Sequence, residues 1–373
     1  MLSRERGLSV PVDLIRTVAI VGVILLHSAN DLTNQQMNWF EIYRWTTVDV
    51  YQSLGRMGVP LFILLTGALL LQPSKLNEPV RVFFKKRVAR LGLAFTFWSV
   101  IYFLWDFLVE HQAFTASAVI NGVLNGPYYQ FWYLYMIAGL YLITPIVRVV
   151  IAHADRNLIK YFIAIWFLGV AIVPLLTLLT PYQLDSNVFT VTGYVGYFVL
   201  GTFLLSVRIN RSTLAILIAV GTALTAIGTY LIAWTVGGGE MYYFQEYLSP
   251  TMILASVMLF LLLNTFQQPK TPQIQTLVTP NEKDPDLQNL PKPNNQSPTR
   301  KLLKLISENT LPLFLLHVIV LETIQRGYLG FALNGNVINS IIGVPLMTVI
   351  VLFVSLGIVL VLKKVPIVKI LIG

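Results

Sequence analysis

The sequence predicts an all-α polytopic membrane protein, a single bundle of about ten transmembrane helices with both termini on the cytoplasmic side. Three observations support this fold class. The chain is 55% hydrophobic and only 12% charged, and its mean hydropathy is +0.70, which is unlike a soluble domain. Its apolar segments are close to the roughly 20 residues that cross a bilayer core. Its Lys and Arg residues gather in alternate loops.

Ten apolar segments justify the helix count, and each is expected to form one membrane helix. They are centred near residues 10–29, 52–71, 89–109, 131–149, 159–179, 190–206, 213–236, 248–266, 304–324 and 339–362. The first segment is too long for the apolar region of a cleaved signal peptide, and no clear cleavage site follows it. We therefore expect it to remain as a signal anchor.

The basic residues predict the orientation. With the N-terminus inside, the inner flanks hold 22 of the 26 Lys and Arg residues. This asymmetry follows the positive-inside rule and requires an even number of helices. It also explains the net charge of +9 without nucleic acid as a partner.

One segment differs from the rest of this single membrane domain (residues 1–373). Residues 267–300 are rich in Pro, Asn and Gln, so we expect a disordered cytoplasmic linker between the eighth and ninth helices. The absence of cysteine excludes disulfides, thiolate metal sites and a cysteinyl acyl intermediate. The sequence contains no metal-binding spacing, phosphate-binding loop or nucleophile elbow, so no metal is expected.

Arg16 and His27 lie within the first apolar segment, VDLIRTVAIVGVILLHSAN. Eleven residues bring a helix back to within about 20° of its starting direction, so the two side chains share one face about 16 Å apart. Ionisable groups at membrane depth usually face a bundle interior or a pathway. The shared face indicates a functional site. In the alternative interpretation, Arg16 snorkels inward and His27 marks the outer interface.

Arg56 lies at the outer end of the second segment, GRMGVPLFILLTGALLL, in the same leaflet as His27. Arginines are scarce on the outer side, which favours a site role over simple interfacial anchoring. Asp49 precedes it and is expected to be its ionic partner. Pro60 should face protein, because neighbouring groups must satisfy the carbonyl that it frees.

Lys86, Arg87 and Arg90 lie in FFKKRVARLG at the inner start of the third helix. The positive-inside rule explains such residues without a ligand. However, Arg87 and Arg90 are three residues apart and share a face. Arginine makes bidentate contacts with phosphate, so the pair is a candidate for holding a phosphorylated cofactor at the cytoplasmic mouth.

His317 and Glu322 lie at membrane depth in ISENTLPLFLLHVIVLETIQ. Five residues separate them by about 140° on an ideal helix, so they are not a simple dyad. His317 is either a second site residue or a satisfied buried histidine.

Several of these segments together resemble the acyltransferase-3 family of integral membrane O-acyltransferases. The resemblance rests on Arg16 and His27 in an Arg-x10-His pattern preceded by Asp13, on Arg56 at the head of RMGVPLFILLTGALLL, and on Arg87 and Arg90 in an Arg-x-x-Arg pattern. FWYLYMIAGLYLITP, GYVGYFVLGTFLL and TLPLFLLHVIV resemble three later landmarks, the last presenting His317. The chain departs from the family at Phe314, where a tyrosine is frequent.

The resemblance implies a multi-pass protein of the inner (cytoplasmic) membrane that contacts membrane lipid. It would transfer an acyl group from cytoplasmic acyl-CoA, most often acetyl-CoA, to a hydroxyl of a cell-envelope polysaccharide, other glycan or lipid-linked sugar. Lys86, Arg87 and Arg90 would hold the nucleotide phosphates, and the pantetheine arm would enter beside Arg16.

The same resemblance gives His27 the role of general base, and a histidine pKa of about 6.5 suits this task. Arg56 would stabilise the oxyanion or orient the acceptor, and His317 would be a second catalytic group. An acyl-histidine intermediate is an alternative to direct transfer. A transporter or flippase with a proton-coupled Arg/His pathway is the alternative function.

Overall fold

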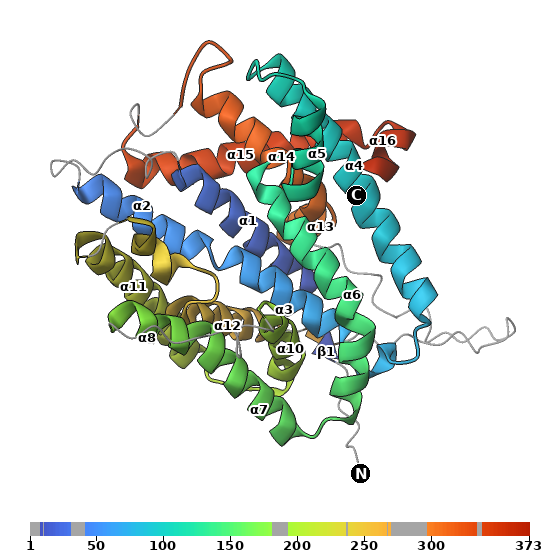
Figure 1. Cartoon of the computed structure of the whole chain (residues 1–373), viewed down its shortest axis with the longest axis vertical. Helices are drawn as coiled ribbons and strands as arrows, with labels where there is room; N and C mark the ends of the chain where they lie inside the picture. Colours follow the sequence, from blue (N-terminus) through green and yellow to red (C-terminus); the bar gives the residue numbers. More distant parts are fainter. Residues whose placement is uncertain are drawn as a thin grey trace, which may run out of the picture.

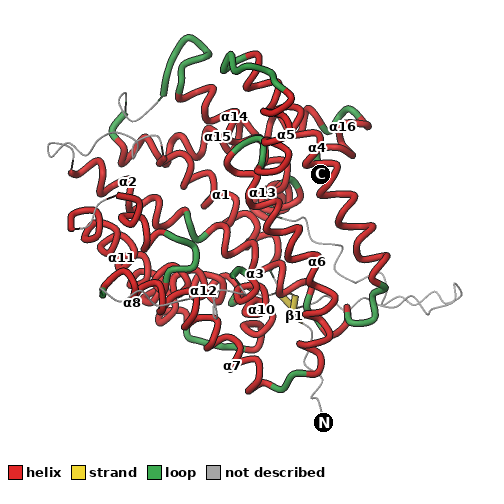
Figure 2. Tube along the Cα trace, viewed as in Figure 1, coloured by secondary structure: helices red, strands yellow, loops and turns green. Residues whose placement is uncertain are grey.

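The computed structural model describes residues 8–9, 11–30, 42–180, 193–235, 238–266, 268–269, 297–333 and 338–373. Helices dominate this part of the chain (Figure 2). Its β-structure consists of two-residue strands, β1 (Leu8–Ser9) and β2 (Gln268–Pro269), which pair antiparallel. The predicted all-α class is confirmed.

The α-helices (Figure 1) are α1 (Val12–Asn30), α2 (Ile42–Gly55), α3 (Gly58–Leu70), α4 (Val80–Leu108), α5 (Ala116–Asn125), α6 (Trp132–His153), α7 (Arg156–Phe167), α8 (Val173–Leu179), α10 (Val195–Phe203), α11 (Arg211–Thr235), α12 (Pro250–Asn264), α13 (Pro298–Glu308), α14 (Thr310–Gln325), α15 (Ser340–Leu362) and α16 (Pro366–Leu371). Short 3-10 segments are η2 (Pro73–Lys75), η3 (Tyr129–Phe131), η5 (Leu204–Ser206) and η6 (Gly238–Gln245), and η4 (Leu168–Ile172) is a π-helix.

Eight helical spans in the described residues are long and apolar enough to cross a membrane, and the bent pair α13–α14 makes a ninth if counted as one span. The segment predicted at 190–206 corresponds to a shorter apolar helix, Val195–Ser206. Every predicted segment therefore has a helical counterpart, which supports a polytopic membrane protein.

Helices α1, α2 and α3 form the middle of the bundle. In Figure 1, α7, α8, α10, α11 and α12 lie on one side of them, and α4, α5, α14 and α15 lie on the other. Contacts of α3 with α10 and α12, and of α1 with α14 and α15, agree with this arrangement. Side chains of α1 are consequently surrounded by protein on several sides, as a buried site requires.

Glycines allow α1 to approach the α2–α3 break closely. A Cβ on Gly55 would lie 2.6 Å from the backbone nitrogen of Leu26, and one on Gly58 would lie 2.5 Å from the carbonyl oxygen of Ala19. Only residues without a side chain fit at such distances. This packing fixes the depth of α1 relative to Arg56.

The break between α2 and α3 follows from Pro60. Proline has no N–H to donate to the carbonyl of residue 56, so the helical hydrogen-bond ladder is interrupted there. Pro60 is buried against protein, as predicted. The break leaves Arg56 between two helices.

A second break separates α13 from α14, whose axes differ by 80°. Ser297 caps α13 by accepting a hydrogen bond from the backbone of Arg300 at 3.3 Å. At the break, the side-chain amide of Asn309 donates to the carbonyl of Leu305 at 2.7 Å. Of the predicted linker 267–300, Gln268–Pro269 form β2 and residues 297–300 form the cap and first turn of α13. Residue 267 and residues 270–296 lie outside the described residues.

Candidate functional site

Two histidines from distant parts of the sequence meet inside the bundle. The ring centroids of His27 on α1 and His317 on α14 are 5.2 Å apart. His317 is fully buried, and its Nδ1 lies 3.2 Å from the carbonyl oxygen of Leu313. A carbonyl only accepts, so this contact assigns the ring proton to Nδ1 and leaves the Nε2 lone pair free. Among the described residues, neither His317 Nε2 nor His27 Nδ1 has a hydrogen-bond partner.

A cavity of about 420 Å³ lies between α1, α3, α4, α6 and the α13–α14 break. All four residues expected to bind the donor line it: Arg16, Lys86, Arg87 and Arg90. The rest of its wall includes rings and hydroxyls from Phe62, Thr66, Tyr133, Tyr141, Ser307 and Phe314. The cavity thus combines a cationic side, suited to an anionic group, with an aromatic side, suited to an apolar one.

The cavity reaches close to the histidine pair. Phe314 lines the cavity, and its ring centroid is 6.0 Å from that of His317. On the cavity side, Phe314 packs against Tyr133 at 5.0 Å. Neither His27 nor His317 is itself a lining residue of the cavity. Phe314 therefore lies between the cationic cavity and the imidazole of His317.

The end of the bundle that carries Lys86, Arg87 and Arg90, here called the basic end, is organised around Glu78. One carboxylate oxygen of Glu78 lies 3.5 Å from Arg87 and 3.7 Å from Lys86, and the other lies 3.1 Å from Arg148. Two opposing effects act on the pKa of Glu78. Partial burial alone would raise it, but the hydrogen bond from Arg148 and the charges of Arg87, Arg148 and Lys86 are stronger, so the pKa lies below its ordinary value. Glu78 is therefore an anionic anchor.

Arg148 belongs to this anchor, although the sequence suggested only a positive-inside flank. Its side chain is buried, and its Nε donates to the carbonyl of Leu70 at 2.7 Å. Arg87 also donates to the carbonyl of Phe83 at 3.2 Å, and its guanidinium lies 4.0 Å above that ring. The sequence does contain a signal for this anchor: Glu78 is an isolated acidic residue in the basic stretch LNEPVRVFFKKR.

Arg56 lies apart from the cavity, next to the ring of Tyr247 at 5.6 Å. It remains close enough to His27 for its charge to act on the imidazole. Arg56 and Asp49 do not form the expected close ion pair, although the charge of Arg56 acts on the carboxylate. Asp49 accepts a hydrogen bond from the Gln245 amide at 2.5 Å. This amide comes from η6, an element that hydropathy does not place beside α2.

Tyr129 was not singled out in the sequence, yet its ring lies 5.1 Å from that of His27. It belongs to η3, in the aromatic stretch PYYQFWY that leads into the first turn of α6. Rings in such a stretch are typical of a membrane interface, which hid the local role of this one.

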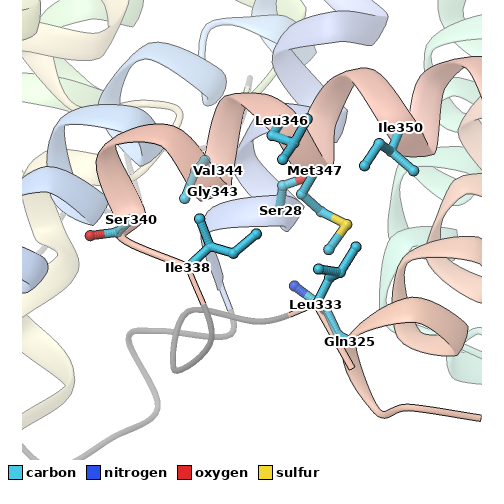
Figure 3. A pocket seen from close by; sticks show the side chains of 10 residues that line it. All are labelled: Ser28, Gln325, Leu333, Ile338, Ser340, Gly343, Val344, Leu346, Met347 and Ile350. Carbon is cyan, nitrogen blue, oxygen red and sulfur yellow. The ribbon is translucent and has the colours of Figure 1, made fainter. Parts of the chain in front are cut away.

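A second, much smaller cavity lies beside Ser28, between α1, α14 and α15 (Figure 3). Its volume of about 20 Å³ is enough for one water molecule and too small for a substrate. Leu333, Ile338 and Met347 make most of its visible wall apolar. In the described part of the chain, no group of three or more His, Cys, Asp or Glu residues is arranged to hold a metal ion.

Comparisons with known proteins agree with this chemistry. A family profile described as an acyltransferase domain matches residues 11–362. The chain is 26% identical over 165 residues to a protein of Acidianus two-tailed virus named "Putative acetyltransferase ORF330". That alignment covers 38% of this chain and 48% of the viral protein, so the chain spans about half the length of this relative. No solved structure matches the chain.

Proposed function

The chain belongs to the acyltransferase-3 family, whose domain covers residues 11–362, and from this premise we propose that it is a membrane O-acyltransferase. The donor is acyl-CoA, in the simplest case acetyl-CoA. The acceptor is a hydroxyl of a glycan or lipid-linked sugar of the cell envelope. The observation that carries the proposal is a pair of facing histidines separated by one aromatic ring from a cavity lined by arginines.

The cavity suits the donor in size and charge. Its volume of about 420 Å³ lies in the usual range for small-molecule sites, roughly 300–1,000 Å³. The proposed contacts of the CoA phosphates are with Lys86, Arg87 and Arg90, because guanidinium groups bind phosphate through charge-assisted hydrogen bonds. Arg16 and the aromatic side of the cavity would then receive the pantetheine arm and the acyl group.

The distribution of basic residues supports a location in the cytoplasmic membrane. By the positive-inside rule, the basic end of the bundle faces the cytoplasm. Cytoplasmic acyl-CoA would then enter at Arg87 and Arg90. His27 lies eleven residues further along α1 than Arg16, towards the opposite membrane face, from which the acceptor would approach.

His27 is the proposed general base. It would remove the acceptor proton while the hydroxyl oxygen attacks the thioester carbonyl carbon. A new ester bond would form, the carbon–sulfur bond would break, and the CoA thiolate would leave and take up a proton. The net reaction converts acyl-CoA and an alcohol into an ester and CoA, with no oxidant, reductant or metal required.

His317 and Arg56 have supporting roles in this proposal. His317 Nε2 has no hydrogen-bond partner among the described residues and would be available to accept a proton or a hydrogen bond. The charge of Arg56 near His27 suits stabilisation of the oxyanion that develops on the carbonyl oxygen.

The proposal is tested with purified protein in lipid, radiolabelled acetyl-CoA and a crude cell-envelope glycan fraction. We expect label in the glycan with the wild type, and a loss of about 10²- to 10⁴-fold for His27→Ala, as for removal of a general base. His153→Ala is the control, because His153 bonds the carbonyl of Val149 at the end of α6 and lies outside the cavity. Equal transfer by the wild type and His27→Ala would contradict the role of His27.

A further inference from the structure

Tyr128 and Glu322 join the loop before α6 to the helix that carries His317. The Tyr128 hydroxyl lies 2.6 Å from both carboxylate oxygens of Glu322 and donates to them. Glu322 is 9% exposed, and Arg326 lies 3.3 Å from it on the next turn. A carboxylate this buried requires partners for its charge. The hydrogen bond from Tyr128 is therefore a strong fastening between loop and helix.

A second contact fastens the same loop to α14. The Tyr128 ring packs against that of Tyr102, with centroids 4.9 Å apart. Tyr102 is fully buried, and its hydroxyl donates to the carbonyl of Leu315 at 2.7 Å. Tyr128 is thus connected to α14 on both sides of His317, directly at Glu322 and through Tyr102 at Leu315.

The contacts of Tyr128 also fix the position of the next residue, Tyr129. Its ring lies 5.1 Å from His27 and 5.2 Å from Tyr128. The Tyr129 side chain is 47% exposed, whereas His317 on the other side of His27 is fully buried. Tyr129 is therefore the exposed aromatic ring in contact with His27.

Glu322 is connected to the site through these contacts and not through its position on α14, where it points away from His317. It bonds Tyr128, and the Tyr128 ring contacts the Tyr129 ring beside His27. The three side chains Glu322, Tyr128 and Tyr129 are here called the acceptor lip.

We propose that Tyr129 contacts the acceptor next to His27, and that Tyr128 and Glu322 are positioning residues that hold the Tyr129 ring there. This inference rests on the acyltransferase function proposed above. An exposed aromatic ring offers an apolar face to the C–H groups of a sugar while its hydroxyl remains free for a hydrogen bond. The acceptor lip therefore acts on acceptor binding, and the cavity at the basic end acts on donor binding.

Tyr128→Phe tests the proposal, because it removes one hydroxyl and keeps the ring that packs on Tyr102. Its control is Tyr243→Phe. The Tyr243 hydroxyl donates to the carbonyl of Ala171 at 2.9 Å, and its ring packs on Phe244 and not on the residues beside His27. Label transfer from acetyl-CoA is measured against the concentration of the crude envelope glycan fraction, and separately against acetyl-CoA.

We expect Tyr128→Phe and Tyr129→Ala to raise the half-saturating glycan concentration about tenfold, the size expected when one hydrogen bond to a charged group is lost. The half-saturating acetyl-CoA concentration should stay unchanged, and Tyr243→Phe should behave as the wild type. Glu322→Gln retains an acceptor for Tyr128, so it should lie closer to the wild type than Glu322→Leu.

A purely structural role would lower the amount of active protein without a selective change in glycan saturation, and that result overturns the proposal. Equal glycan saturation in Tyr128→Phe and the wild type overturns it as well. Absence of label transfer by the wild type is a different outcome, since it overturns the acyltransferase function itself.

Discussion

The Phe314 ring lies 6.0 Å from the His317 ring, and Phe314 is at the same time a wall of the cationic cavity. Its other neighbour, Tyr133, is 5.0 Å away on the cavity side. A group that enters the cavity from the basic end and reacts at the histidines must therefore pass along these rings. Under the proposed function, the position of Phe314 determines how much room the acyl chain has there.

Phe314→Ala should shift donor preference from acetyl-CoA towards butyryl-CoA. Each methylene that the enlarged cavity buries is worth about 0.8 kcal/mol, so two methylenes change the ratio of the kcat/KM values about tenfold. Phe95→Ala is the control, because Phe95 packs on Phe131 and Tyr135 outside the cavity. An unchanged ratio in Phe314→Ala would show that Phe314 does not border the acyl group.

Replacing both Arg87 and Arg90 with Gln should weaken donor use more than acceptor use. Hydrogen bonds to charged groups contribute about 1.5–3 kcal/mol each, so we expect the KM for acetyl-CoA to rise at least tenfold on this scale. Lys85→Gln removes an exposed charge from the same helix without touching the cavity, and it should leave the KM unchanged. A normal KM for acetyl-CoA in the double variant would show that the two arginines do not bind the donor.

Glu78 should make stability depend on acidic pH. The pKa of Glu78 lies below the ordinary value of 4.5 in the folded protein. The carboxylate therefore contributes stability that is fully present above pH 4.5 and is lost as the pH falls through the lowered value. The thermal midpoint of the wild type should decline more steeply below pH 4.5 than that of Glu78→Gln. Parallel declines would show that the ion pairs of Glu78 add no stability.

Gly201→Ala should destabilise the bundle where α3 crosses α10. A methyl group there would overlap the backbone carbonyl of Leu64, and overpacking of this kind costs about 1–3 kcal/mol. Gly92→Ala is a matched control, because a Cβ on Gly92 meets no atom within 4 Å. Thermal unfolding in detergent should show a lowered midpoint for Gly201→Ala alone. Equal midpoints would contradict the close crossing.

The helical part of the fold is predictable because hydropathy is a local property. Twenty apolar residues must satisfy their backbone hydrogen bonds within one segment in a bilayer, so each predicted segment has a helical counterpart. The helix breaks depend on less regular signals. Pro60 indicates the α2–α3 break, and Pro312, at the same third position of α14, indicates a break near Asn309, but neither proline predicts the 80° angle between α13 and α14.

The contacts of the site were harder to predict because they join residues far apart in the chain. Helical spacing predicts that Arg16 and His27 share a face, but it does not predict that His317 packs against His27. Glu322 illustrates the limit: its angle on α14 separates it from His317, and only the loop containing Tyr128 relates it to the histidine pair. The direct ion pair expected between Asp49 and Arg56 is replaced by a hydrogen bond from Gln245 of η6 to Asp49, although the charge of Arg56 still acts on that carboxylate.

The most direct test of the central claim is the stoichiometry of the reaction in proteoliposomes that contain the purified protein. Acetyl-CoA labelled in the acetyl group is supplied with the envelope glycan fraction, and free CoA and labelled glycan are both quantified. The proposed function predicts one acetyl group in glycan for each CoA released above the hydrolysis seen without glycan. Movement of unmodified glycan across the membrane with no release of CoA would contradict it and favour a transporter.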